Sequence, residues 1–468
     1  MTTEVPPAAT VNASSDILSR DYRWTTIGAF ALVFLGAFEA LAVTTIMPTV
    51  SRALDGEALY SLAFSGTLAT SVVGMVVAGG WADRRGPARP LVTAILVFLL
   101  GLILSGAALN MEMFIAGRLL QGLGSGAINV CLYVVVARIY PPAMHPKIFG
   151  AFAAAWVLPS LIGPPVAGVV ADTISWHWVF LGVGVLVIAA SGTILPAVKQ
   201  LWTSDVHEPE SPRLGLNILL SVVVAVGVIG VSFAAEADGA ITWIIAAVAF
   251  AVVIVALRPL VPKGTLLVRR GLPATVLLRG AVAAAFFATE VYLPYFLSSQ
   301  YGLATWASGL ILTVGAVSWA IGSAVQGRLG ERMSHDAAVR TGAILLVVGL
   351  ATQFLTAFFV LSPIVAAAGW LFAGGGMGLI FPRIGTLVLA YSTKRDQGFN
   401  SAAMSITDAA GGATSIAFAG LLFAAAGAAT GGGFVAALAL TAVLAVAAVP
   451  VAFRVRASGR LLALPPAT

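Results

Sequence analysis

Five charged side chains lie deep inside long apolar segments of the sequence: Glu39, Arg118, Glu290, Arg383 and Asp408. A charge at the centre of a membrane-spanning helix costs about 2.5–3.5 kcal/mol on insertion scales, so it normally faces protein or water and serves a purpose. A buried carboxyl group holds a proton more readily, whereas a nearby guanidinium group favours the ionised form. Residues of these types in these positions therefore predict proton binding and release rather than covalent chemistry.

The elements that must position these charges are membrane helices. Of the 468 residues, 59% are hydrophobic and only 9% are charged, whereas roughly a quarter of the residues of a soluble domain are charged. The apolar runs are continuous and about 20 residues long, enough for a helix to cross a bilayer. We expect an all-α polytopic membrane protein with fourteen spans. The expected spans are 25–50, 59–82, 90–109, 113–139, 147–171, 177–198, 215–235, 241–260, 273–298, 305–328, 338–360, 363–391, 398–425 and 432–453.

Several classes of function are excluded by what the sequence lacks. Cys131 is the only cysteine, and the four histidines are scattered without ligand spacing. These facts argue against a disulfide framework and a cysteine-based zinc site. No nucleophile–base pair or phosphate-binding loop stands out either. We therefore expect neither an enzyme nor a bound metal or cofactor, with the proton as the coupling ion.

The basic residues predict the orientation in the membrane. Lysine and arginine are enriched in the cytoplasmic loops of membrane proteins, and here almost all fall in loops on one side, with Arg52 as the exception. The net charge of +6 is then a signal of topology and not of nucleic-acid binding. We expect a monomer in the inner or plasma membrane with both termini in the cytoplasm. The basic residues are Arg84, Arg85, Arg89, Arg138, Lys147, Lys199, Arg213, Arg258, Lys263, Arg269, Arg270, Arg328, Arg332, Arg340, Lys394, Arg395, Arg454, Arg456 and Arg460.

The chain also contains an internal repeat. MPTVSRALDG (47–56) aligns with LPYFLSSQYG (293–302), and AGRLLQGLGSGA (116–127) aligns with AGWLFAGGGMGL (368–379), at offsets of 246 and 252 residues. Two six-helix halves in parallel, with two extra spans between them, explain this spacing. Parallel halves of this kind mark one architecture of secondary transporters, in which the substrate binds between the halves near the middle of the membrane.

Two segments resemble signatures of the major facilitator superfamily. GGWADRRG is similar to its loop 2–3 signature, Gly-x-x-x-Asp-Arg-x-Gly, with Gly79, Asp83, Arg84 and Gly86 in the matching positions. The basic pair expected after the last glycine is replaced by proline and alanine. RLLQGLGSGA (118–127) resembles the helix-4 signature of the family. The resemblance implies that the loop residues gate the change of conformation.

Other segments resemble the 14-helix drug–proton antiporter branch of this superfamily. FEALAVTTIMP resembles the helix-1 signature of that branch, with Glu39 in place of the usual aspartate, and WHWVF (176–180) resembles the start of its helix 6. IGPPVAG resembles the helix-5 antiporter signature, with Gly163, Pro164 and Gly168 matching. We expect these three residues also to take part in gating.

The resemblance and the repeat together imply a proton-coupled exporter of hydrophobic, possibly cationic, small molecules that works by alternating access. The expected domains are an N-terminal bundle (1–200), a linker carrying spans 7 and 8 outside the cavity (201–264), and a C-terminal bundle (265–468). Three alternatives stay open. One is an exporter of a lipid, siderophore or other endogenous metabolite, another is a nutrient importer, and the third is a receptor or scaffold that transports nothing.

The expected site residues fall into two further groups. The proton-coupling group is Glu39, Arg118, Glu290 and Asp408, with Arg118 controlling the proton affinity of Glu39, and each half is expected to offer one acid and one arginine to the cavity. We also expect Arg383 and Asp408 to form an ion pair or a water-bridged pair. A purely structural Arg118 and a solvated Glu290 are the alternatives. The substrate cavity is expected to be lined by Phe38, Gln121, Trp156, Phe286 and Arg383.

Overall fold

The computed structural model describes residues 16–141, 144–202, 214–237, 239–329, 332–393, 396–427 and 431–456. Within these ranges fourteen helices are long and apolar enough to cross a membrane. Every expected span overlaps one of them, so the all-α polytopic fold is confirmed. The helices are α1 (Arg23–Ala53), α2 (Leu62–Arg85), α3 (Ala88–Gly106), α4 (Met111–Ile139), α5 (His145–Thr173), α6 (His177–Trp202), α7 (Leu214–Phe233), α8 (Ala240–Leu257), α9 (Leu272–Tyr301), α10 (Thr305–Leu329), α11 (His335–Phe359), α12 (Pro363–Tyr391), α13 (Gln397–Ala425) and α14 (Gly432–Ala452).

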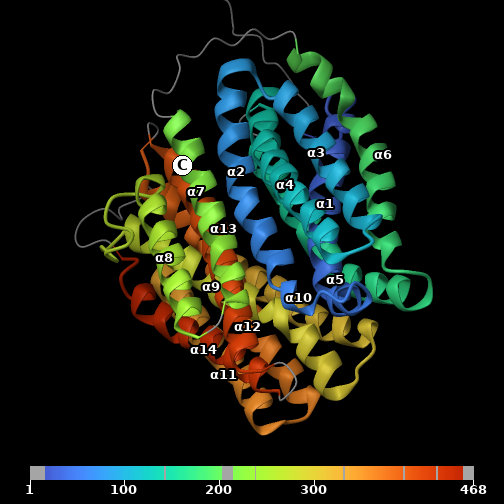
Figure 1. The fold of residues 1–468 in the computed structure, drawn as a ribbon. Coiled ribbons are helices and arrows are strands. Elements are labelled where there is room, and N and C mark those ends of the chain that lie inside the picture. Colours follow the sequence, from blue (N-terminus) through green and yellow to red (C-terminus); the bar gives the residue numbers. More distant parts are fainter. Residues whose placement is uncertain are drawn as a thin grey trace, which may run out of the picture.

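The helices form two bundles and a connecting pair (Figure 1). Helices α1–α6 pack on one another, as do α9–α14, while α5 meets α10 and α2 meets α13 where the bundles touch. Helix α7 packs along both α2 and α13, and α8 packs on α7. The boundaries at residues 200 and 264 stay predictions. We call the end of the molecule where α2, α4 and α12 terminate the inner end, and the opposite end the outer end.

Glycines explain how α4 fits between its neighbours. A Cβ atom on Gly124 would lie 2.6 Å from the backbone nitrogen of Phe98 in α3, and one on Gly117 would also collide with α3. Gly122 and Gly126 lie against backbone carbonyls of α2 in the same way. Small residues let two helix backbones approach closely in a membrane. The glycines following Arg118 therefore hold α4 tightly against α2 and α3.

The second bundle repeats this packing at the same offset. The residues 252 positions later are Gly369, Gly374, Gly376 and Gly378 in α12. Gly369 and Gly376 lie against α11, whereas Gly374 and Gly378 lie against α10. Each glycine of α4 thus has a counterpart that meets the equivalent neighbour. The repeat predicted from the sequence is therefore also a repeat of helix contacts.

The two bundles close on each other at the outer end. The Tyr60 hydroxyl donates a hydrogen bond of 2.8 Å to the carbonyl oxygen of Val291 in α9, and its ring stacks on Tyr295 with centroids 4.7 Å apart. The hydroxyl groups of Thr49 in α1 and Thr305 in α10 lie 3.1 Å apart. These contacts seal the outer end between the halves.

The orientation of the molecule in the membrane stays a prediction. The basic residues Arg213, Lys394, Arg395 and Arg460, on which part of that prediction rests, lie outside the described residues. The described basic residues that follow α2 and α4 lie at the inner end. If the prediction holds, the inner end faces the cytoplasm.

Candidate functional site

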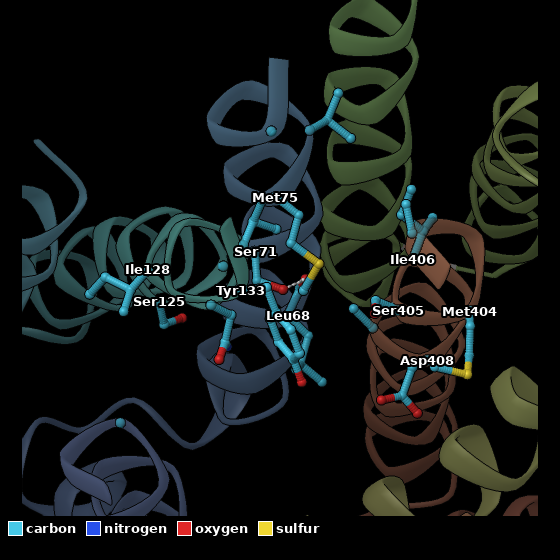
Figure 2. Close-up of a pocket in the computed structure, with 18 of the residues that line it drawn as sticks. Leu68, Ser71, Met75, Ser125, Ile128, Tyr133, Met404, Ser405, Ile406 and Asp408 are labelled. Carbon is cyan, nitrogen blue, oxygen red and sulfur yellow. Dashed lines mark hydrogen bonds between the residues drawn. The ribbon is translucent and has the colours of Figure 1, made fainter. Parts of the chain in front are cut away.

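A large cavity separates the two bundles. Its volume is about 1440 Å³, and it is lined by α1, α2, α4, α5 and α6 from the first bundle and by α9, α12 and α13 from the second. Figure 2 shows Ser71 and Met75 of α2 across this cavity from Asp408 of α13. The lining extends to exposed residues at the inner end, among them Asp83 and Phe399. The structure is therefore closed at the outer end and open at the inner end.

Glu39 and Arg118 form an ion pair in the wall of this cavity. The Nη1 atom of Arg118 donates to a carboxylate oxygen of Glu39 and to the side-chain oxygen of Gln121, and Nε donates to the carbonyl oxygen of Ala63 at 3.2 Å. Glu39 is 5% exposed and Arg118 is 3% exposed. The amide of Gln121 in turn donates to the hydroxyl group of Ser105 at 3.2 Å. Glu39 and Arg118, which were expected to lie close together, thus form a direct contact that joins α1 to α4. The role of this pair in proton coupling stays a prediction.

A second ion pair lies on the opposite wall, and it corrects one prediction. Arg279 of α9 donates from Nε and Nη2 to the two carboxylate oxygens of Asp408, at 3.0 and 3.2 Å. Its guanidinium group also lies 3.4 Å from the centre of the Phe381 ring. The predicted partner, Arg383, instead contacts Nδ1 of His335 and the carbonyl oxygen at position 326. The predicted direct ion pair between Arg383 and Asp408 is therefore wrong, because α13 packs mainly on α9 whereas α12 packs mainly on α10 and α11.

Glu290 is the third acid deep in the cavity. It lines the wall contributed by α9 and is partly exposed to the cavity. Within the described part of the chain it forms no ion pair, whereas Glu39 and Asp408 each contact an arginine. The expectation of one acid and one arginine per half therefore fails in the second half, where Arg383 points away from Glu290 towards α10 and α11.

The expected lining of the cavity is only partly correct. Trp156 lines it, but Phe38, Gln121, Phe286 and Arg383 are not among the described lining residues. Phe286 is 2% exposed and stacks on Trp370 with ring centroids 4.5 Å apart. Adjacent helix positions differ by about 100° in direction, so it is the next residue, Phe287, that faces the cavity.

Phe38 and Gln121 were also expected to line the cavity, but their side chains contact neighbouring helices instead. A Cβ atom on Gly163 of α5 would lie 3.4 Å from the ring of Phe38, so that ring lies at the contact between α1 and α5. Gln121 is fully buried and supports Arg118 from behind. Both side chains therefore pack behind the residues that line the cavity.

Helix α7 also departs from expectation. Leu214 and Asn217, in its first turn, line the cavity near the inner end, although spans 7 and 8 were expected to lie outside it. The reason is the position of α7 over the seam between α2 and α13. The side chain of Leu214 packs directly on Gly80 of α2, where an added Cβ atom would collide with the Cδ1 atom of Leu214.

The residues expected to act in gating form two groups, one of which lies at the inner mouth of the cavity. Gly79, Asp83 and Arg84 line its inner mouth. Gly86 ends α2 with φ +76°, a conformation that favours glycine. These positions agree with a role in gating, which stays a prediction.

The other three expected gating residues lie in α5. A Cβ atom on Gly168 would lie 2.6 Å from the Cα atom of Trp306, and one on Gly309 would lie 2.9 Å from the carbonyl oxygen of Pro164. Gly168 and Pro164 thus lie at the tight contact of α5 with α10 between the two bundles, and Gly163 lies nearby against α1. Their gating role likewise stays a prediction.

Sequence reasoning missed the partner of Asp408 and selected the wrong one of two adjacent phenylalanines. Arg279 lies near the inner end of α9, 129 residues before Asp408, and no sequence pattern links the two side chains. Phe287 is one of several aromatic residues that could line a pocket, but the expected lining included its neighbour Phe286 instead. A signal was available for Phe287, because it precedes Glu290 by three residues, and residues three apart share a helix face.

The comparisons with known proteins agree with this architecture. Residues 29–416 match the model of a family described as the Major Facilitator Superfamily. The multidrug transporter protein MdtP of Bacillus subtilis (strain 168) is 26% identical over 383 residues, which cover 79% of this chain and 69% of that protein. The multidrug efflux pump SdrM of Staphylococcus aureus (strain N315) is 22% identical over 373 residues, covering 78% and 81%. The family resemblance read from the motifs is thus confirmed.

Solved structures share the fold. A POT family transporter in complex with 5-aminolevulinic acid superposes with a TM-score of 0.66 at 15% identity, covering 91% of this chain and 94% of that one. A bacterial homologue of the human lysosomal transporter Spinster gives a TM-score of 0.63 at 15% identity, covering 92% and 96%. At such identities the likeness concerns the fold alone.

Proposed function

Since the chain belongs to the Major Facilitator Superfamily, and is thus a multi-pass membrane transporter rather than an enzyme, we propose that it exports hydrophobic small molecules in exchange for protons. Two curated relatives are named as a multidrug transporter and a multidrug efflux pump. Substrates of this kind suit a cavity whose lining is mostly apolar. The cell membrane, cytoplasmic termini and a monomeric state belong to the same proposal.

The contact between Glu39 and Arg118 supports proton coupling most strongly. It occurs in a conformation whose cavity opens at the inner end. A guanidinium group beside a carboxylate favours its ionised form, and burial without such a partner favours the protonated form. A proton carried by Glu39 would therefore leave towards the inner end when the pair forms, while a substrate enters from the same side.

The outward half of the cycle requires the pair to separate. Rocking of the two bundles about the central site would open the outer end and close the inner end. Because α1 and α4 belong to the same bundle, separation of the pair also requires a movement of α1 relative to α4 within that bundle. Separated from Arg118, a buried Glu39 would bind a proton from outside as the substrate leaves. Arginine stays protonated in proteins, so Arg118 acts as a fixed charge and Glu39 as the group that exchanges the proton.

The proposal is tested by transport into inverted membrane vesicles. An inside-acid pH gradient should drive accumulation of hydrophobic compounds, and collapse of the gradient with a protonophore should abolish it. A panel containing drugs, lipids and siderophores separates a drug exporter from an exporter of an endogenous metabolite. Accumulation in right-side-out vesicles with an outside-acid gradient would instead identify an importer and contradict the proposal. A Glu39→Gln chain that transports like the wild type would contradict the role given to Glu39.

A further inference from the structure

A groove at the outer end of the molecule is separate from the central cavity. Its volume is about 770 Å³, and it lies between the last turns of α1 and α5 and the residues that lead into α10. Both bundles contribute to it, since Thr49 of α1 and Thr305 of α10, whose hydroxyl groups lie 3.1 Å apart, are in its wall. Small-molecule sites typically enclose about 300–1,000 Å³. The groove is therefore large enough to hold the polar headgroup of a lipid.

Two exposed side chains of opposite charge line this groove. Arg52 lies in the last turn of α1 and is the exception to the one-sided distribution of basic residues, and Asp172 lies in the last turn of α5. The Nε atom of Arg52 donates to the carbonyl oxygen of Pro48 at 3.0 Å. Within the described residues, neither the terminal nitrogens of Arg52 nor the carboxylate of Asp172 has a further hydrogen-bond or ion-pair partner. The groove therefore offers a cation that can bind a phosphate group and an anion that can bind an ammonium group.

Exposed apolar side chains continue from the groove towards the middle of the membrane. Val169 of α5 lines the groove, and Val166 and Ile162 follow it on the same helix face, because residues three or four apart share a face. Trp306 of α10 also lines the groove, and Leu310 follows one turn deeper. All five side chains are 44–50% exposed. Tryptophan is enriched where the hydrocarbon core of a membrane meets the headgroups, so the groove lies at headgroup level and the apolar faces lie where acyl chains run.

We propose that this groove binds one phospholipid whose zwitterionic headgroup carries a primary ammonium group. The guanidinium group of Arg52 binds the phosphate, for which its planar set of donors is well suited. The carboxylate of Asp172 accepts hydrogen bonds from the ammonium group, and the acyl chains lie along the exposed faces of α5 and α10. A choline headgroup has no N–H group to donate, and a glycerol headgroup has no positive charge, so both fit less well. The inference depends neither on the transported substrate nor on the coupling ion.

Native mass spectrometry of the purified full-length protein in detergent tests this site by lipid titration. The probes are the dioleoyl forms of phosphatidylethanolamine, phosphatidylcholine and phosphatidylglycerol, which share their acyl chains and differ only in the headgroup. The first phosphatidylethanolamine should bind about fivefold more tightly than the other two lipids, as expected for an exposed charge pair. Asp172→Asn should remove this preference, whereas Asp172→Glu should retain it.

Arg52→Gln should weaken binding of all three lipids, because each carries a phosphate group, and Arg52→Lys should bind with intermediate affinity. Two variants serve as matched controls. Glu112→Gln neutralises an exposed acid at the start of α4, also at the outer end, and Arg328→Gln neutralises an exposed arginine at the inner end of α10. Neither residue lines the groove, so both variants should bind the lipids like the wild type.

Several results would overturn the assignment. They are equal affinities of the wild type for the three lipids, tighter binding of phosphatidylcholine or phosphatidylglycerol, and a preference for phosphatidylethanolamine that persists in Asp172→Asn. Glycerophosphoethanolamine has the same headgroup without acyl chains and should not displace the bound lipid at equal concentration; if it does, the groove binds a soluble phosphate ester and not a lipid. Thermal melting of each variant separates a loss of binding from a loss of folding. If Arg52→Gln does not fold, Arg52→Lys must still bind all three lipids more weakly than the wild type.

Discussion

The pair of Arg279 and Asp408 offers a sharp test of the packing between α9 and α13. Arg279→Gln and Asp408→Asn each remove one charge and leave the other in the wall of the cavity, whereas the double variant removes both. If the two side chains interact as the structure shows, the destabilisation of the double variant will be smaller than the sum of the two single effects.

The expected coupling follows from the geometry. Two hydrogen bonds of 3.0 and 3.2 Å join the guanidinium and carboxylate groups, whose side chains are 16% and 23% exposed. Exposed ion pairs contribute about 0.2–1 kcal/mol, and breaking a fully buried pair costs about 3–5 kcal/mol. A bidentate pair that is partly exposed to a cavity lies between these limits, so we expect a coupling free energy of about 2 kcal/mol.

Unfolding of the four proteins by sodium dodecyl sulfate in mixed micelles measures this coupling. The same cycle on Arg456 and Asp336, a pair 3.8 Å apart in which the arginine is 72% exposed, should give less than about 0.5 kcal/mol. A cycle on Arg383 and Asp408 should give no coupling. A coupling for Arg383 with Asp408 that exceeds the coupling for Arg279 with Asp408 would refute the assigned pairing.

Three other predictions concern packing, gating and orientation. Gly124→Ala should destabilise the protein by about 1–3 kcal/mol through overpacking against α3. Gly182→Ala, at a position with open space around it, should not destabilise the protein. Equal melting temperatures of the two variants would contradict this packing. Tyr60→Phe should lose the hydrogen bond to Val291 across the outer seal, worth about 0.5–1.5 kcal/mol. It should also increase labelling, from the outer side, of a cysteine introduced into the cavity, and unchanged labelling would argue against a gating contact. A single cysteine at Ser458, outside the described residues, should resist impermeant reagents added to intact cells, and its labelling would reverse the predicted orientation.

The helices were predictable because the bilayer imposes their length and composition. Each apolar run of about 20 residues predicts one span, and all fourteen overlap helices of the structure. The glycines of α4 and α12 were also readable, since a shared offset of 252 residues places them against equivalent neighbours. Features that depend on one helix at a time could thus be read from the sequence.

The details of the site depend on the rotation of each helix about its own axis. The sequence alone does not determine this rotation. Phe286 and Phe287 are equally apolar neighbours, yet one packs on Trp370 and the other lines the cavity. The choice between Arg279 and Arg383 as partner of Asp408 depends on the packing of α13 against α9. An all-apolar helix carries no amphipathic signal for its orientation, so these choices need the three-dimensional packing.

We propose that Glu39, controlled by Arg118, carries the coupled proton. Transport by Glu39→Gln in proteoliposomes tests it most directly, with accumulation driven by a pH gradient compared with substrate counterflow in the absence of a gradient. We expect Glu39→Gln to lose accumulation but retain counterflow, and Glu39→Asp to retain both. Accumulation by Glu39→Gln with the pH dependence of the wild type would contradict the claim and make Asp408 or Glu290 the better candidate for the proton carrier.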